Sequence, residues 1–322
     1  MTGRDTSFPD SVVALSGGVG GARMADGLAR ALTDEKRLSI IVNTADDFSH
    51  LGLFISPDVD TVLYTLAGLE NPETGWGRAD ETWSFMGALT QLGGEDWFRL
   101  GDKDLALHAI RSRGLADGMP LEAVIDRLRQ RLGVAADVLP MSNERVQTMV
   151  ETDKGMVGFQ DYFVRQRCAP KVKGFAFVGA SEARPPARLL ERLADPRLGA
   201  IVIGPSNPLV SIAPILAVPG LRAALEASPA PVVAVSPLVG GRAVKGPAAK
   251  MIAELGQVPS ISWIAEFYSG LIDGLVVDEI DRDAAAQIRG PRVHVTQTIM
   301  RDDDAREKLA ADVLAFARDI RS

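Results

Sequence analysis

Four aspartates within a short stretch are the first residues whose types and spacing could do chemistry. Asp46 and Asp47 follow an apolar run that ends at Val42, and Asp58 and Asp60 precede a second apolar run. A hard cation such as Mg²⁺ prefers oxygen ligands from one or two carboxylates together with substrate phosphates. Acidic side chains are also common as helix caps and in solvated loops. The stretch therefore indicates either a metal-binding site or ordinary helix-start chemistry.

A glycine-rich segment, S-G-G-V-G-G-A-R at 16–23, lies ahead of these acids between an apolar run and a helical stretch expected over Met24–Leu32. Glycine lets the backbone approach a phosphate closely, and a helix N-terminus presents free N–H groups to it. The segment is not a dinucleotide fingerprint, because Arg23 stands where the third glycine belongs, and no P-loop lysine follows. The segment predicts either a phosphate cradle or a tight turn between a strand and a helix.

Two later strand ends carry small polar residues. The expected strand 200–203 runs into Gly-Pro-Ser-Asn-Pro at 204–208, and the strand 232–235 leads towards Lys245 and Lys250. Ligands of open α/β sheets bind outside the carboxyl ends of the strands. Ser206 and Asn207 are therefore candidates for contacts to a base or a phosphate, and the two lysines are weaker candidates. The alternative is that these residues only form a turn between a strand and a helix, where Gly, Pro, Ser and Asn are common.

For several other polar residues, the sequence favours structural roles over catalytic ones. Arg99, Asp102, Lys103 and Asp104 are expected to form a surface ion-pair network. His108 is expected to pack within a helix, because it has no partner at a motif spacing.

The order of apolar segments predicts the elements that position these candidates. Strands rich in Val, Ile and Ala are typical of a sheet covered on both faces. We expect an α/β fold with a Rossmann-like, mostly parallel sheet, helices on both faces and a largely helical insertion. Residues 10–75 and 170–322 would form the nucleotide-binding core, and 76–169 the mostly helical insertion. Within that insertion, strand-like pieces are expected at 148–152 and 158–164.

Composition narrows the class of protein. The chain has 322 residues, 46% of them apolar, and a net charge of −7, which argues against a nucleic-acid partner. Cys168 is the only cysteine, so an intramolecular disulfide is impossible. Because no apolar run is long enough to cross a bilayer and no signal peptide is apparent, a cytoplasmic protein without a membrane partner is expected.

Eight ordered motifs together resemble the 2-phospho-L-lactate transferase family, whose bacterial members act as phosphoenolpyruvate transferases in the biosynthesis of coenzyme F-420. The motifs are S-G-G-V-G-G-A-R at 16–23, N-T-A-D-D at 43–47, S-P-D-V-D-T-V-L-Y-T-L-A-G at 56–68, G-W-G-x-x-D-E-T-W at 75–83, L-G-D-K-D at 100–104, L-P-M-S-N at 139–143, G-P-S-N-P at 204–208 and V-S-P-L-V-G-G at 235–241. The match spans nearly the whole chain.

The resemblance implies a reaction. A phosphorylated three-carbon acid would pass from a guanosine-diphosphate-linked donor to the hydroxyl of the deazaflavin Fo, with release of GMP and a requirement for Mg²⁺. The acid would be the phosphoenolpyruvate, 2-phospho-L-lactate or 3-phosphoglycerate moiety. The family has a Rossmann-like fold, homodimers are usual, and the insertion contributes to the acceptor site.

The resemblance also implies roles for individual residues. Asp60 and Arg99 would bind the deazaflavin. As a hypothesis from the chemistry of transfer, Asp46, Asp47 or Asp60 would hold the metal, and Asp60 or Asp47 would accept the proton of the hydroxyl, with Asp60 favoured. Archaeal members carry a Thr-Gly-Thr-type loop where this chain has Val-Gly-Gly, which favours a bacterial donor. The expected guanosine-diphosphate contacts are Gly17, Gly18, Gly20, Ser206 and Asn207.

Two other functions fit the same sequence. A related family linked to gluconeogenic growth resembles a sugar-nucleotide-binding regulatory protein, which has no need of an acidic cluster beside an acceptor. A nicotinamide-dependent oxidoreductase on a Rossmann-like core is a weaker alternative, since the third glycine and a ribose-binding acid after the second strand are both missing.

Overall fold

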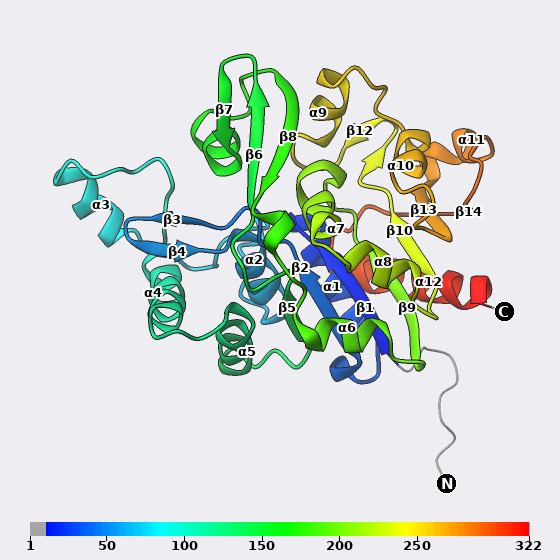
Figure 1. Ribbon diagram of the computed structural model, residues 1–322, viewed down its shortest axis with the longest axis horizontal. Helices are drawn as coiled ribbons and strands as arrows, with labels where there is room; N and C mark the ends of the chain where they lie inside the picture. Colours follow the sequence, from blue (N-terminus) through cyan, green and yellow to red (C-terminus); the bar gives the residue numbers. More distant parts are fainter. Residues whose placement is uncertain (1–10, 322) are drawn as a thin grey trace, which may run out of the picture.

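A seven-stranded sheet forms the centre of the computed structural model, which describes residues 11–321 (Figure 1). Every neighbouring pair in this sheet is parallel, which confirms the α/β, Rossmann-like prediction. Residue 10, where the core was expected to begin, lies outside the described residues. In spatial order the strands are β14 (Arg292–Thr296), β13 (Gly274–Asp278), β10 (Val232–Val235), β9 (Leu198–Ile203), β1 (Ser11–Ser16), β2 (Leu38–Val42) and β5 (Asp137–Pro140).

Helices cover both faces of this sheet because its strands present apolar side chains alternately to each side. Val12 and Ala14 of β1 join one core cluster, and Val13 and Leu15 join the other. The first face is covered by α1 (Gly18–Ala31), α2 (Pro57–Leu66), α4 (Asp102–Ala116), α5 (Leu121–Arg131) and α12 (Asp303–Arg321). The second is covered by α6 (Ala187–Leu193), α7 (Ala213–Ala217), α8 (Leu221–Glu226), α9 (Ala248–Glu254), α10 (Ile261–Phe267) and α11 (Arg282–Ala285).

Strand β1 lies where the strand order reverses. The chain moves from β1 to β2 and β5 on one side, then returns to place β9 on the other side of β1. The loops after β1, β2 and β9 therefore leave the same edge of the sheet beside one another, and open α/β sheets bind ligands at such a point.

The segment between β2 and β9 supplies the elements outside the main sheet. The hairpin β3 (Phe48–His50) and β4 (Leu53–Ile55) and helix α3 (Ser84–Gln91) extend to one side of the sheet (Figure 1). A three-stranded antiparallel sheet contains β6 (Gln147–Thr152), β7 (Gly155–Gly158) and β8 (Val172–Val178). Since β5 joins the main sheet and β8 pairs with β6, the expected boundaries at 76 and 169 stay a prediction.

Some expected elements differ from those observed. The predicted strand over 158–164 is wrong, because β7 ends at Gly158 and residues Asp161–Arg165 form a short helical segment. Short hairpin strands β11 (Leu238–Val239) and β12 (Arg242–Ala243) follow β10. Within residues 11–321, the structure contains no helix with the length and apolarity needed to cross a membrane.

Candidate functional site

All four aspartates of the acidic stretch are buried at the carboxyl edge of the sheet. Asp46 and Asp47 follow β2, while Asp58 and Asp60 lie in the first turn of α2, and each is at most 8% exposed. The Ser-Pro pair at 56 and 57 starts α2 here, because proline is well accommodated in the first turn of a helix. Burial excludes the interpretation of Asp46 and Asp47 as solvated loop acids.

Asp58 connects the acidic cluster to the glycine segment. Its Oδ1 accepts a hydrogen bond from the backbone N–H of Gly18 at 2.8 Å. Its Oδ2 accepts one from Asn43 Nδ2 at 3.0 Å, and the same amide donates to Asp46 Oδ2 at 3.0 Å. The glycine segment and the acids therefore lie on one connected hydrogen-bond network.

The cluster holds more negative charge than its hydrogen bonds satisfy. Burial raises the pKa of Asp46 and Asp47 well above the ordinary value, and neighbouring carboxylates raise both further. Burial also raises the pKa of Asp58 to about 6, although hydrogen bonds from Asn43 and Gly18 lower it. Asp46 Oδ1 and Asp47 Oδ1 are buried and have no hydrogen-bond partner. Because unpaired buried carboxylate oxygens are costly, these two atoms fit a divalent cation.

Asp60 has a different environment from the other three. Both of its oxygens face the guanidinium of Arg111 on α4, and Arg111 Nη1 lies 3.1 Å from Asp60 Oδ2. Both side chains are buried. Burial raises the pKa of Asp60, while the positive charge of Arg111 opposes this shift. Asp60 is thus paired with a cation in the protein itself.

His108 extends this pair into a longer network. Its Nδ1 lies 3.3 Å from Arg111 Nη1, and its Nε2 lies 3.1 Å from Asp104, which also accepts a hydrogen bond from Tyr64. Asp60, Asp104 and His108 are close enough to hold a metal ion. The adjacent positive charge of Arg111 opposes a cation at this group, although His108 Nε2 has no hydrogen-bond partner.

The glycine segment packs against the loop after β9. The backbone N–H of Gly17 donates to Ser206 Oγ at 3.1 Å. A Cβ atom at Gly20 would lie 2.2 Å from the carbonyl oxygen of Pro205, so this glycine permits close packing of two loops. Gly18 has a φ of +62°, and no atom lies near the position of its missing Cβ. Asn207 caps the next helical turn, with Oδ1 accepting from Leu209 N at 3.0 Å.

Arg99, the second predicted deazaflavin contact, lies on the exposed segment before α4. Its guanidinium is stacked 4.2 Å above the ring of Trp83. The arginine that Asp60 contacts is Arg111, which the sequence reasoning did not select. The spacing of Asp104, His108 and Arg111 at i, i+4 and i+7 is the signal that places all three on one helix face.

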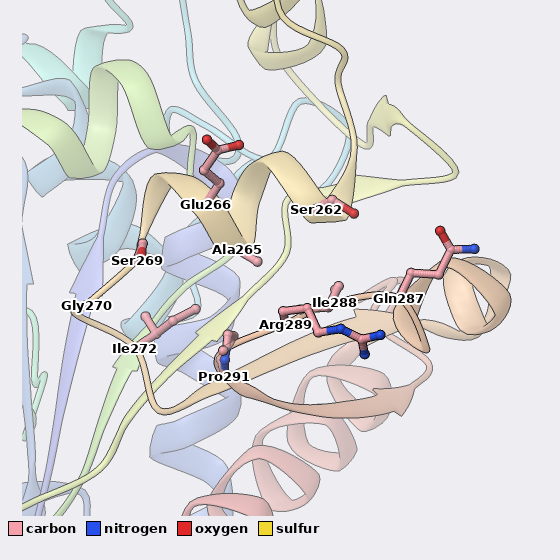
Figure 2. Close-up of a pocket in the computed structure, with 11 residues that line it drawn as sticks. Ser262, Ala265, Glu266, Ser269, Gly270, Ile272, Gln287, Ile288, Arg289 and Pro291 are labelled. Atoms are coloured by element: carbon pink, nitrogen blue, oxygen red, sulfur yellow. The ribbon is translucent and has the colours of Figure 1, made fainter.

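A pocket of about 340 Å³ lies between α10 and the loop that precedes β14 (Figure 2). Residues 269–272 and 288–291 lead into β13 and β14, so this pocket opens at the amino edge of the sheet. The side chains of Glu266 and Arg289 point in different directions (Figure 2). The pocket is therefore separate from the glycine and aspartate network.

Comparison with known proteins was made on the whole chain. A family model described as 2-phospho-L-lactate transferase CofD matches residues 12–316. A phosphoenolpyruvate transferase of Kitasatospora aureofaciens is 42% identical, covering 96% of this chain and 98% of the relative. A 2-phospho-L-lactate transferase of Methanopyrus kandleri is 40% identical, with coverage of 95% and 97%.

A crystal structure of a UPF0052 family member from Bacillus halodurans has the same fold. It matches with a TM-score of 0.59 at 18% identity and covers 95% of this chain and 99% of that chain.

Proposed function

Because the chain belongs to the 2-phospho-L-lactate transferase CofD family, we propose that it transfers a phosphorylated three-carbon acid from a guanosine-diphosphate-linked donor to a hydroxyl of the deazaflavin Fo. GMP is released, and the product belongs to coenzyme F-420 biosynthesis. The observation that supports this proposal best is the hydrogen bond between Gly18 N and Asp58, which joins the glycine segment to the acids. A diphosphate bond is broken at such a junction.

The glycine segment and the loop after β9 form the donor side. Helix α1 begins at Gly18, whose N–H donates to Asp58, so the N–H groups of Val19 and Gly20 in the first turn are the ones proposed to face phosphate oxygens. Ser206 holds the backbone at Gly17, and Asn207 shapes the neighbouring turn. Gly17, Gly18 and Ser206 are therefore proposed contacts to the guanosine diphosphate, while Gly20 and Asn207 position these loops.

Asp46 and Asp47 are the proposed ligands of Mg²⁺, because each has a buried oxygen without a partner. When bound, Mg²⁺ would neutralise charge on the diphosphate and on the departing GMP. Asp60 is a weaker ligand candidate, because Arg111 contacts both of its oxygens.

Transfer needs a group that accepts the proton of the Fo hydroxyl. The hydroxyl oxygen forms a bond to the phosphorus that carries the three-carbon acid, and the bond from this phosphorus to GMP breaks. Asp60 and Asp47 are the proposed acceptors of the proton, and a positioned base typically contributes about 10²–10⁴-fold in rate. Arg99 and the exposed ring of Trp83 are proposed to bind the acceptor.

Mass spectrometry of the reaction product tests this function. Purified protein is incubated with Fo, MgCl₂ and each of three guanosine-diphosphate-linked donors, which carry the phosphoenolpyruvate, 2-phospho-L-lactate or 3-phosphoglycerate moiety. We expect a deazaflavin whose mass increases by one phosphorylated acid, together with an equal amount of GMP. If no donor yields a modified deazaflavin, the proposed transferase activity is wrong.

A further inference from the structure

Two cationic side chains from distant parts of the chain meet beside the start of α1. A Cβ atom at Gly75 would lie 3.0 Å from Lys245 Nζ and 3.3 Å from Arg23 Nη2. The same position would lie 2.9 Å from Val19, in the first turn of α1. Gly75 is buried and has a φ of +75°, and the loop Asn71–Gly77 lies against both cations, of which Arg23 is half-buried and Lys245 is exposed.

No carboxylate among residues 11–321 forms an ion pair with either of these cations. Lys245 Nζ donates to the carbonyl oxygen of Thr74 at 3.0 Å, and Arg23 Nη1 donates to that of Met300 at 3.3 Å. Arg23 Nε is buried without a hydrogen-bond partner. Burial lowers the pKa of Lys245, and the positive charge of Arg23 lowers it further. Two like charges held together in this way favour an anion between them.

The acids nearest to the pair have other partners. Glu70 interacts with Arg306 through one oxygen and accepts a hydrogen bond from Thr65 through the other. Asp303, which lines a pocket of about 450 Å³ together with Arg23, forms ion pairs with Arg30 and Arg306. The charge of Glu70 opposes the lowering of the pKa of Lys245, but within residues 11–321 no carboxylate contacts Arg23 or Lys245 directly.

We propose that Arg23 and Lys245 form an anion-binding site for the terminal phosphate of a nucleoside diphosphate, with the loop Asn71–Gly77 as its cover. This inference rests on the proposed function, because it assigns the diphosphate of the donor to the start of α1. Val19 in the first turn of α1 lies beside Gly75 together with both cations, so a diphosphate bound at the start of this helix would lie next to them. The site distinguishes a diphosphate from a monophosphate.

Isothermal titration calorimetry in buffer with MgCl₂ tests the site with three probes, which are GDP, GMP and inorganic pyrophosphate. The variants are Arg23→Gln, Lys245→Gln and the charge-conserving Arg23→Lys. Lys173→Gln is the matched control, since Lys173 is exposed on β8, in the antiparallel sheet outside the main sheet. Melting temperatures show whether each variant is folded.

We expect each Gln variant to bind GDP and pyrophosphate about 10- to 100-fold more weakly, the loss of one charged hydrogen bond. GMP affinity should stay unchanged, Arg23→Lys should recover part of the GDP affinity, and Lys173→Gln should bind as the unmodified protein does. Equal losses of affinity for GDP and GMP would contradict the proposed anion-binding site.

The same titrations separate this inference from the proposed function. If the unmodified protein binds GDP and both Gln variants bind it equally well, the anion site is wrong and the transferase proposal stands. If it binds pyrophosphate but not GDP, the anion site stands and the guanosine-linked donor is wrong. Binding of neither probe contradicts the anion site.

Discussion

Arg111 on α4 is paired with Asp60 on α2 through both carboxylate oxygens, and neither side chain is accessible to solvent. A fixed positive charge at this distance favours the ionised form of Asp60 and reduces its strength as a base. The charge of Arg111 therefore opposes transfer of a proton from a hydroxyl to Asp60. The pair therefore links the stability of the fold to the chemistry proposed for Asp60.

Replacement of Arg111 by Met should destabilise the protein by about 3–5 kcal/mol, because it leaves the buried charge of Asp60 without a partner. In the double variant Asp60→Asn with Arg111→Met, the loss in free energy of unfolding should be smaller than the sum of the losses in the two single variants. Urea unfolding measures these free energies. Arg113→Met is the control, because Arg113 and its partner Asp117 are exposed on the same helix and should contribute less than about 1 kcal/mol.

Replacement of Asp60 by Asn tests the role of this residue in transfer. If Asp60 accepts the proton, turnover with Fo and a donor should fall by about 10²–10⁴-fold, while GDP affinity should change little. Asp47→Asn, assayed in parallel, distinguishes the two candidate bases, because only the true base should show a loss of this size at saturating MgCl₂. Near-normal turnover of Asp60→Asn would remove it from both the base and the metal roles.

Substitution of Gly20 and of Gly18, both in the glycine segment, should have very different effects on stability. Ala at position 20 would place its Cβ 2.2 Å from the carbonyl of Pro205, so the loops must separate and the melting temperature should drop strongly. In Gly18→Ala the new Cβ contacts no atom, so the free energy of unfolding should fall only by the cost of a positive φ, about 1 kcal/mol. Thermal unfolding of both variants checks this order, and equal losses would contradict the observed packing.

The acidic cluster predicts how stability depends on pH. The pKa of Asp58 is raised to about 6 in the folded protein, so folding favours its protonated form. Its contribution is complete below its ordinary pKa near 4 and is lost as the pH rises through about 6. Without metal, the melting temperature should therefore fall between about pH 4 and pH 6.

Added MgCl₂ should raise the melting temperature more at about pH 7.5 than at about pH 5, since ionised carboxylates bind the cation. Differential scanning fluorimetry with MgCl₂ or EDTA measures both effects. Asp47→Asn should reduce the response to MgCl₂. A response that is equal at the two pH values would argue against a cation at these carboxylates.

The sequence was sufficient to predict the sheet and the meeting of the glycine segment with the acids. Both follow from one rule, since residues after parallel strands lie at a single edge of the sheet. The start of α1 at Gly18 was less predictable, because a glycine run indicates a turn rather than a helix. Position 20 lies within the helix and is still glycine because the carbonyl of Pro205 leaves no room for a side chain.

The pairing of Asp60 with Arg111 could not be predicted from spacing alone. The two residues lie on different helices, and the sequence gives no crossing angle or distance between them. Asp104 was expected in a surface ion-pair network, and His108 was expected to have only a packing role. Both belong to the same buried network. Charged residues repeated on one face of a helix fit either interpretation until the neighbouring helix is known.

The hydrogen bond from Gly17 to Ser206 joins residues 189 positions apart in the chain. During translation, the glycine segment and all four aspartates leave the ribosome long before β9 is made. A nascent or truncated chain that ends before β9 holds the acids but lacks the strand that completes the other side of β1. Such a chain therefore cannot form the hydrogen bond between Gly17 and Ser206 or the packing of Gly20 against Pro205, which hold the glycine segment in place.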